Sequence, residues 1–545
     1  DTKSNPLQQK DALNQITRWR YDSYGQVISM TNALSQTTRF AYNSYGDQTI
    51  ITDAMGFVNS ASYDLVGRKL SETDALGYTS TYAYDAANRL LTVSAPLGKV
   101  TRYEYDAVGN RVVITDARGG ITRYAYDAKD RLVSVRDPLN KLTSFTYDAI
   151  NNQTSVSDPL THITTYEYDA LNRRTAVEDA LGNRTTFHYD ADGNQTQVVD
   201  AKLYTTTYVY DARSQLLQVS DAENGVVRYG YDAIGNRVVM TDANNHVTRY
   251  TYDALNRLIQ EKNPLNQISA STYDAVGNQI RLTKADGKVI TYTYDSLNRL
   301  ASTIYPSGTL SFAYDALGNR TRMTDTLGVT TYHYDALYRL TQVDQISGTL
   351  QYGYDLNDNR TVITYPANSP VTYVYDLNNR LTSVTDTAAR TTTYVYDDAG
   401  RQTEIHYPNG VQAISSYDNA NRLLSIVQTS AVSGTITFVS YTLDAIGNRL
   451  TMLDAEGTTS YLYDKLYRLN QVGYPNGETV TYSYDAMGNR TSMNSSLAGT
   501  TTYTYDAADR LLSFTHNSIA TSMTWDANGN MTGKGSATYA FDALD

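Results

Sequence analysis

The sequence contains no cysteine in 545 residues, so disulfide bonds and cysteine-ligated metals are excluded. Its histidines form no His-x-x-x-His or Glu-x-x-His pair, and no metal site is therefore expected. They are His162, His188, His246, His333, His406 and His516. No apolar run approaches the roughly 18 residues that a membrane-spanning helix needs. A formal charge of -12 and a pI near 5.0 argue against a nucleic-acid-binding surface.

Motifs of the common enzyme classes are also missing. No Gly-x-Ser-x-Gly elbow is present to anchor a hydrolase triad, and no glycine-rich phosphate loop precedes a helix. Aspartates are plentiful, but the Asp that recurs from repeat to repeat stands at the first position of a turn. Capping of backbone N–H groups explains its presence there without catalysis or calcium binding. Examples are Asp106, Asp127, Asp232 and Asp253. The sequence therefore predicts no catalytic, cofactor-binding or metal-binding residues, and no enzyme.

Tyrosine, in contrast, is abundant: 50 of the 545 residues are Tyr. From Tyr21 to Tyr294 a marker tyrosine returns every 21 residues, which is the signature of a repeat architecture. The best copies read Tyr-Asp-Ala-x-Gly-Asn-Arg, and we expect their residues to determine the structure of the repeat. These residues are Tyr105, Asp106, Gly109, Asn110, Arg111, Tyr231, Asp232, Gly235, Asn236, Arg237, Tyr314, Asp315, Gly318, Asn319, Arg320, Tyr484, Asp485, Gly488, Asn489 and Arg490.

The repeat from Tyr84 to Tyr105 shows how each unit is built. It begins with a turn at residues 85–88, continues as an apolar stretch and reverses at a second turn, residues 95–98. In the better copies the first turn has Asp first and Gly fourth. A type I turn favours both, because the carboxylate accepts from backbone N–H groups and Gly adopts positive φ. Short turns between strands of about six residues predict antiparallel neighbours.

Side chains are expected to alternate along each strand. Thr101, Tyr103 and Tyr105 should point to one face, and Arg102 and Glu104 to the other. Equivalent tyrosines recur two strands apart, so one face becomes a nearly continuous aromatic and aliphatic layer. Such a layer could also stack on sugars, but packing within the sheet explains its uniformity better.

The predicted fold is all-β, with tandem hairpins of about 21 residues joined into one long antiparallel sheet. Some fifty strands at ~4.8 Å each would make a ribbon ~240 Å wide. Open sheets of more than about ten strands curl, split or close. We therefore expect the sheet to spiral into a hollow shell or a barrel.

The array is expected to be continuous over residues 17–545, and residues 1–16 to be a lead-in from a longer protein. The spacing loosens after Tyr294. A longer hairpin is expected near residues 425–440, and the repeats degenerate over residues 525–545. The array stops within a turn, which also indicates a segment of something longer.

The Tyr-Asp-Ala-x-Gly-Asn-Arg copies and the Thr-x-Tyr-x-Tyr strands closely resemble the YD or RHS repeats of bacterial Rhs polymorphic toxins, toxin-complex proteins, wall-associated proteins and animal teneurins. The resemblance covers essentially residues 17–545. It implies a sheet that spirals into a hollow shell, which in the toxin members encloses a C-terminal toxin. Those members usually follow the repeats with Asp-Pro-x-Gly motifs for self-cleavage, whereas Asp137-Pro138 and Asp158-Pro159 lie in turns inside repeats here.

The leading hypothesis is therefore a structural shell segment of an Rhs-type toxin, without chemistry of its own, that carries a C-terminal toxin cargo belonging to the same full-length protein. The alternative is an extracellular adhesive stalk or filament that binds a protein or a glycan. Both imply a secreted or cell-surface protein, most simply a bacterial one. Secretion-system and cell-surface proteins are further candidate partners, and no nucleic acid or membrane span is expected.

Overall fold

The computed structural model describes residues 5–541 as one antiparallel β-sheet of 52 strands. Each strand pairs with the strands before and after it, as β10 (Val100–Tyr105) does with β9 (Leu90–Ser94) and β11 (Arg111–Thr115). The one helical element among the described residues is a 3-10 turn, η1, at Pro96–Gly98. Within residues 5–541, no helix has the length and apolar character that crossing a membrane requires. The predicted all-β meander is confirmed.

The strands follow one another at nearly constant spacing. The first 23 are β1 (Gln8–Lys10), β2 (Ile16–Tyr21), β3 (Val27–Thr31), β4 (Thr37–Tyr42), β5 (Gln48–Thr52), β6 (Val58–Tyr63), β7 (Lys69–Thr73), β8 (Thr79–Tyr84), β9, β10, β11, β12 (Ile121–Tyr126), β13 (Leu132–Arg136), β14 (Leu142–Tyr147), β15 (Gln153–Ser157), β16 (Ile163–Tyr168), β17 (Arg174–Glu178), β18 (Arg184–Tyr189), β19 (Gln195–Val199), β20 (Thr205–Tyr210), β21 (Leu216–Ser220), β22 (Val226–Tyr231) and β23 (Arg237–Thr241). The next 23 are β24 (Val247–Tyr252), β25 (Leu258–Lys262), β26 (Ile268–Tyr273), β27 (Gln279–Thr283), β28 (Val289–Tyr294), β29 (Leu300–Tyr305), β30 (Gly308–Tyr314), β31 (Arg320–Asp325), β32 (Gly328–Tyr334), β33 (Leu340–Gln345), β34 (Gly348–Tyr354), β35 (Arg360–Tyr365), β36 (Ser369–Tyr375), β37 (Leu381–Thr385), β38 (Thr391–Tyr396), β39 (Gln402–His406), β40 (Val411–Tyr417), β41 (Leu423–Ser430), β42 (Gly434–Leu443), β43 (Arg449–Asp454), β44 (Gly457–Tyr463), β45 (Leu469–Gly473) and β46 (Thr479–Tyr484). The last are β47 (Arg490–Ser495), β48 (Gly499–Tyr505), β49 (Leu511–His516), β50 (Ile519–Trp525), β51 (Met531–Lys534) and β52 (Ala537–Thr538).

Many strands that end at a marker tyrosine have one half-buried face and one exposed face, as β10 shows, whereas strands such as β9 and β13 are half-buried along their whole length. Tyr103 and Tyr105 are half-buried on one side, whereas Arg102 and Glu104 are exposed on the other. The two-residue period of a strand separates the two sets. Only eight apolar residues of the described chain are fully buried, because a sheet one layer thick has no second layer to cover its tyrosine face.

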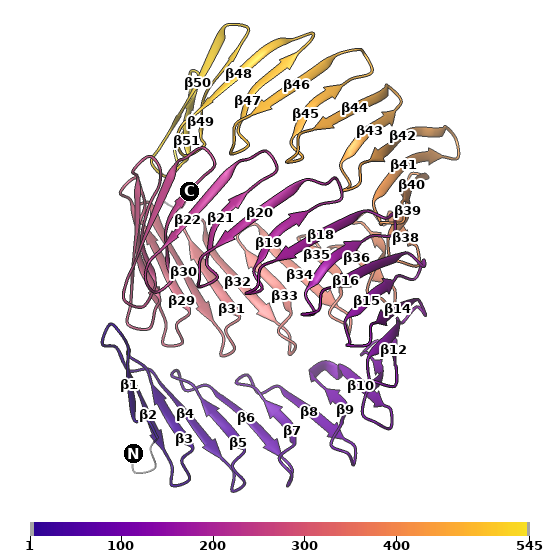
Figure 1. Ribbon diagram of the computed structural model, residues 1–545. Coiled ribbons are helices and arrows are strands. Elements are labelled where there is room, and N and C mark those ends of the chain that lie inside the picture. Colours follow the sequence, from indigo (N-terminus) through magenta and orange to yellow (C-terminus); the bar gives the residue numbers. More distant parts are fainter. Residues whose placement is uncertain (1–4, 542–545) are drawn as a thin grey trace.

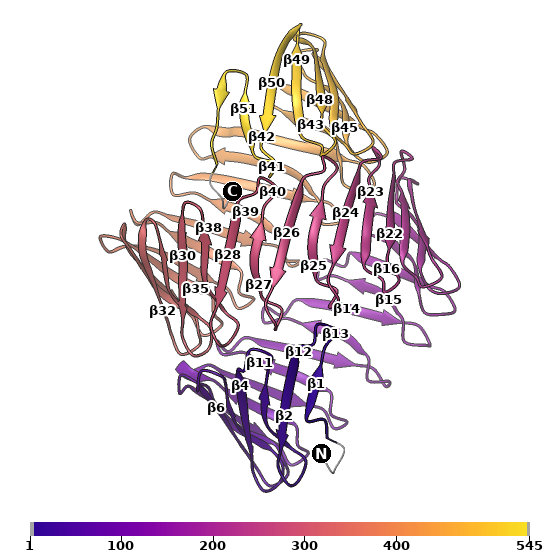
Figure 2. The ribbon, with the colours of Figure 1, turned by 90° about the vertical axis from the view of Figure 1, so that its left-hand side faces the viewer.

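The sheet curls on itself, so that later hairpins lie against earlier ones. Contacts join residues 241 or 242 positions apart, such as Asn357 with Asp116 and Lys202 with Asp444, and also residues 257 to 267 positions apart, such as Arg118 with Tyr375 and Tyr467 with Asp200. A turn of the first coil thus lies between two neighbouring turns of the second, and dividing these separations by the 21-residue repeat gives about twelve repeats, or about 24 strands, in each coil of the spiral. In both views the indigo hairpins β1 to β9 lie below the hairpins β29 to β36 of the second coil (Figures 1 and 2). The predicted spiral is confirmed.

Three stretches that the sequence singles out have the following structures. Strand β1 lies within residues 1–16 and pairs with β2 through a turn like those of the later hairpins. Strands β41 and β42, of 8 and 10 residues, form a hairpin that is longer than its neighbours and includes residues 425–440. Strands β51 and β52 have 4 and 2 residues and fall within residues 525–545, of which 542–545 lie outside the described residues.

Candidate functional site

Each repeat has two turns at opposite edges of the sheet, and these turns hold most of the repeated polar residues. We call the turn after the marker tyrosine the YD turn, such as residues 106–110, and the turn at the opposite edge the second turn, such as residues 116–120. In the YD turn Gly109 N donates to Asp106 O, and Asp106 N donates to Asn110 O. Most second turns repeat this pattern. It is a type I turn followed by one residue in the left-handed region.

The aspartate at the first position organises the YD turn. Asp106 Oδ1 accepts from the backbone N–H of Val108, Gly109 and Asn110 at 3.1, 2.8 and 2.8 Å. Its Oδ2 accepts from Asn110 Nδ2 at 3.1 Å. Burial alone would raise the pKa of Asp106, but these hydrogen bonds outweigh it and hold the pKa below its usual value. The same side-chain bond joins Asp232 to Asn236, Asp315 to Asn319 and Asp485 to Asn489.

The fourth residue of the YD turn lies in the left-handed region. Gly109 has a φ of 105°, and Gly235, Gly318 and Gly488 have φ values of 98°, 93° and 93°. Asn88 holds the same position in another repeat with a φ of 66°, as its short polar side chain allows. A Cβ at Gly109 would meet no atom within 4 Å. Backbone strain, and not a clash, therefore favours glycine here.

The marker tyrosine ties its strand to the preceding one. The ladder between β9 and β10 ends at Arg102 and Thr92, and beyond it Tyr105 Oη donates to Leu90 O at 2.8 Å. Equivalent bonds join Tyr231 to Leu216, Tyr314 to Leu300 and Tyr484 to Leu469 at 2.7 to 2.9 Å. The phenol thus extends the strand pairing where backbone bonds stop.

The last arginine of the motif lies among the aromatic rings. The guanidinium of Arg111 is 5.5 Å from the Tyr103 ring centre and 6.0 Å from that of Tyr124. Arg237, Arg320 and Arg490 each lie over two aromatic rings in the same way. Cation–π contacts therefore alternate with tyrosines across the half-buried face.

An arginine at the fifth position of many YD turns is a determinant that the sequence motif missed. Arg89 Nε lies 2.7 Å from Asp85 Oδ2, its Nη1 donates to Asp106 O at 2.8 Å, and its guanidinium is 5.0 Å from the Tyr105 ring centre. One side chain thus joins a YD turn to the next one along the edge. The sequence did contain a signal for this arrangement, because the fifth residue of successive YD turns is mostly either Arg or Asn. The stacked arrangement recurs at Arg68, Arg131, Arg173, Arg257, Arg299, Arg339, Arg380, Arg401 and Arg468.

Opposite edges of the sheet meet where one coil lies on the next, along a line that we call the seam. Because second turns and YD turns lie at opposite edges of the sheet, the second turns of the first coil face YD turns of the second. Tyr338 donates its hydroxyl to the Asp74 carboxylate, and Asn378 Nδ2 donates to Asp137 Oδ2 at 2.5 Å. Further donor–acceptor pairs are Lys99 with Asp358, Arg118 with Asp355, Asn357 with Asp116, Lys141 with Asp398, Asn244 with Asp485 and Lys465 with Glu223.

Lys202 forms a partly buried ionic contact at the seam. Its Nζ lies 2.8 Å from Asp444 Oδ2, on a residue that is 9% exposed, and 5.5 Å from the ring centres of Tyr204 and Tyr467. Burial alone would raise the pKa of Asp444, but hydrogen bonds, that of Lys202 first, hold the pKa below its usual value. Burial and a hydrogen bond to Asp200 raise the pKa of Tyr467.

The third residue of each YD turn shows whether another coil covers it. In the first coil this residue is exposed, with values of 86% at Tyr24, 75% at Val108 and 71% at Ile234. From Leu255 onward, where the second coil lies on the first, it is half-buried in every described YD turn except that of Met487, which is 40% exposed. The seam therefore covers a row of mostly apolar side chains as well as polar pairs.

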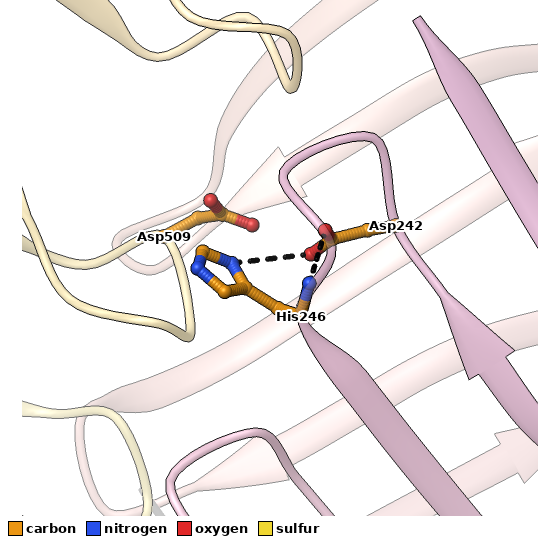
Figure 3. Close-up of side chains that lie close together, drawn as sticks. All are labelled: Asp242, His246 and Asp509. Carbon is orange, nitrogen blue, oxygen red and sulfur yellow. Dashed lines mark hydrogen bonds and ion pairs between the residues drawn. The ribbon is translucent and has the colours of Figure 1, made fainter.

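Two carboxylates and a histidine come together at one point of the seam (Figure 3). Asp242 and His246 belong to the second turn between β23 and β24, and Asp509 belongs to the YD turn between β48 and β49. One ligand atom of each lies within 4.8 Å of the other two. Asp242 is 6% exposed, and its Oδ2 is 3.4 Å from His246 Nδ1. Sequence spacing predicts no metal site, since Asp509 comes from the next coil.

A hollow of about 320 Å³ lies beside Tyr338. Its charged groups are already paired, because Glu72 contacts Lys69 at 2.9 Å and the Tyr82 hydroxyl, while Asp74 accepts from Tyr338. Burial and the Glu72 contact raise the pKa of Tyr82 to about 12. These groups form structural pairs, and no catalytic activity is indicated.

Two family models match the chain. The teneurin YD-shell model matches residues 110–257 and 478–544. The RHS repeat model matches residues 21–57, 63–98, 84–121, 273–310, 314–350 and 375–412. The chain belongs to the YD/RHS-repeat family. Among curated proteins, no sequence matches this YD/RHS-repeat chain.

Solved structures share the fold of this YD/RHS-repeat chain. The crystal structure of TcdB2-TccC3 without its hypervariable C-terminal region is 14% identical, covers 99% of this chain and matches with a TM-score of 0.79. TcdB2-TccC3 is 15% identical over 97% of the chain with a TM-score of 0.75. A Photorhabdus luminescens Tc holotoxin pore is 15% identical over 95% of the chain, with a TM-score of 0.51. The chain spans 40%, 38% and 34% of the respective solved chains.

Gly109→Val should destabilise its hairpin by about 1–3 kcal/mol, because a β-branched side chain is strained at positive φ. Hydrogen exchange of the β10 and β11 amides measures the local free energy of opening. Gly109→Asn is the matched control, since Asn88 occupies this position elsewhere, and it should cost less than about 1 kcal/mol. Unchanged exchange in Gly109→Val would contradict the left-handed geometry.

Leu317→Asp should destabilise the contact between the two coils by about 1–2 kcal/mol, because it places a charge in a partly buried, carboxylate-rich contact. Val108→Asp is the matched control in an identical turn of the first coil, where the position is 75% exposed. Asp192 already holds that position in the first coil. Hydrogen exchange of the seam turns should accelerate in Leu317→Asp alone, and equal acceleration in both variants would disprove the seam.

Acid should loosen the YD turns between about pH 4 and pH 2. A hydrogen bond from Arg131 lowers the pKa of Asp127 to about 2, against an unfolded value near 3.9. A depressed folded pKa contributes stability above the unfolded pKa, and this is lost as pH falls through the folded pKa. Hydrogen exchange of residues 127–131, corrected for its intrinsic pH dependence, should show this transition. Asp127→Asn should abolish it locally, and a transition that persists in that variant would assign it to another group.

Proposed function

We propose that this chain is a shell segment of an Rhs-type polymorphic toxin that encloses and carries a C-terminal toxin. The observation that supports this best is the closed coil, in which about twelve repeats bring the sheet back onto itself along the seam. A sheet that closes in this way separates an inside from an outside. An adhesive stalk would require an extended array.

The dimensions of a coil leave room for a cargo. About 24 strands at ~4.8 Å give a circumference of ~115 Å and hence a diameter of ~37 Å. Facing sheets fill a gap of only ~10 Å with their side chains. The side chains of this sheet are therefore too short to fill the interior of a coil.

The relatives support the same proposal. One solved relative is described as lacking its hypervariable C-terminal region, so in that protein a variable segment belongs with the matched shell. For this chain we propose a corresponding cargo in the full-length protein, secretion from a bacterium, and delivery with secretion-system or cell-surface proteins. The polar pairs of the seam fit a structural role without catalysis.

Electron microscopy of the purified chain tests the shell directly. We expect rounded particles that show a ring with an inner diameter of a few nanometres in end view. An extended ribbon or a filament that grows with concentration would contradict the shell and would instead favour the adhesive stalk.

Protease protection then tests the cargo. A short cleavable peptide joined after Asp545 in the full chain should be cut at least about tenfold more slowly than the same peptide joined before Asp1. Equal cleavage of the two fusions would contradict enclosure of a C-terminal cargo, even if the particle is a ring.

A further inference from the structure

Many polar contacts at the seam pair a donor with a carboxylate, and the position of Asp242 does not. A hydroxyl or cationic side chain faces a carboxylate at Tyr338 with Asp74 and at Lys202 with Asp444. Asp509 instead faces Asp242, so two acceptors meet, with the His246 imidazole beside them (Figure 3). Two carboxylates at this distance repel unless a cation or a proton lies between them.

His162 provides an internal comparison for His246. Both histidines hold the fifth position of a second turn that begins with Asp. His162 Nδ1 lies 3.0 Å from Asp158 Oδ2 and makes a hydrogen bond. His246 Nδ1 lies 3.4 Å from Asp242 Oδ2, is buried and makes no hydrogen bond. Of these two positions, the one that faces a carboxylate from the next coil thus leaves its ring nitrogen without a hydrogen bond.

Each carboxylate at this position is held through one oxygen and has a second oxygen available. Asp242 Oδ1 accepts from the backbone N–H of Asn244 and His246 at 2.9 and 2.8 Å. Asp509 Oδ1 accepts from Asn489 Nδ2 at 2.7 Å. Supporting bonds of this kind orient the ligands of protein metal sites. Together the three residues offer two carboxylate oxygens and one imidazole nitrogen.

We propose that Asp242, His246 and Asp509 bind a divalent transition-metal cation of the Zn²⁺ class, which joins the second coil to the first. Imidazole with two carboxylates is a donor set that such cations accept, with water completing the coordination. Metal–ligand distances of about 2.0–2.2 Å require the three side chains to move together by small rotations. The cation neutralises the facing carboxylates and links the two coils at this repeat.

Calorimetric titration of the chelator-treated full chain with Zn²⁺ tests the proposal. We expect one saturable site per chain, with binding weakened at least about tenfold in His246→Gln and in Asp509→Asn, each of which removes one ligand. His162→Gln is the matched control, because it changes a histidine at the same turn position, where the turn of the next coil presents Asn419 and Asn421, and it should bind like the original chain. Circular dichroism confirms that each variant remains folded.

Hydrogen exchange shows where the cation acts. Zn²⁺ should slow exchange in both residues 242–246 and residues 506–510, and this joint protection should vanish in Asp509→Asn. Absence of saturable binding to the folded chain, or equal binding by His246→Gln, would overturn the proposal. Protection of both turns on acidification alone, without any response to Zn²⁺, would also overturn it and would assign the position to a protonated histidine.

Discussion

The aspartate that begins a turn connects three levels of this structure, because a carboxylate has two oxygens that can bond in different directions. At Asp85, Oδ1 accepts from backbone N–H groups of its own turn while Oδ2 holds Arg89, which reaches the next turn. At Asp74, Oδ1 again closes its own turn, but the second oxygen accepts from Tyr338 in the next coil. The same residue type therefore supports the hairpin, the row of hairpins and the stack of coils.

The opposite edges of the sheet explain where this pattern changes along the chain. Stacking places first-coil second turns under second-coil YD turns, and those second turns mostly begin with Asp or Asn. After β28 many second turns differ: Tyr305 pairs with Gly308, and Asp325 pairs with Gly328, through two-residue turns. A partner about 242 residues after Tyr305 would lie beyond residue 541. Within the described chain no coil lies on these turns, and the aspartate pattern is relaxed there.

Local structure was predictable from the sequence, and the relation between coils was not. Asp106 and Gly109 stand at positions that turn chemistry prefers, and the alternation around Tyr103 separates the two faces, because these features depend on neighbouring residues. The number of strands in a coil depends on a small rotation between strands, summed over many of them, which no single repeat encodes. His246 and Asp509 come together only because the rotations between all the strands of one coil add up to a full turn. For the same reason the spacing of the histidines could not indicate the cluster with Asp242.

The seam changes how an array of this kind can come apart. A simple row of repeats depends on nearest neighbours, so it frays from its ends. Contacts across about twelve repeats couple many turns to a second, distant turn, and fraying there must break the contacts with both the neighbouring and the distant repeat. The polar contacts among them are partly exposed, and exposed ion pairs are individually weak. Separating two coils therefore requires much less free energy than unfolding the hairpins, because the backbone hydrogen bonds between strands stay intact. A stack of coils held in this way can open along the seam while every repeat remains folded, which is the property that the proposed container would need to release a cargo.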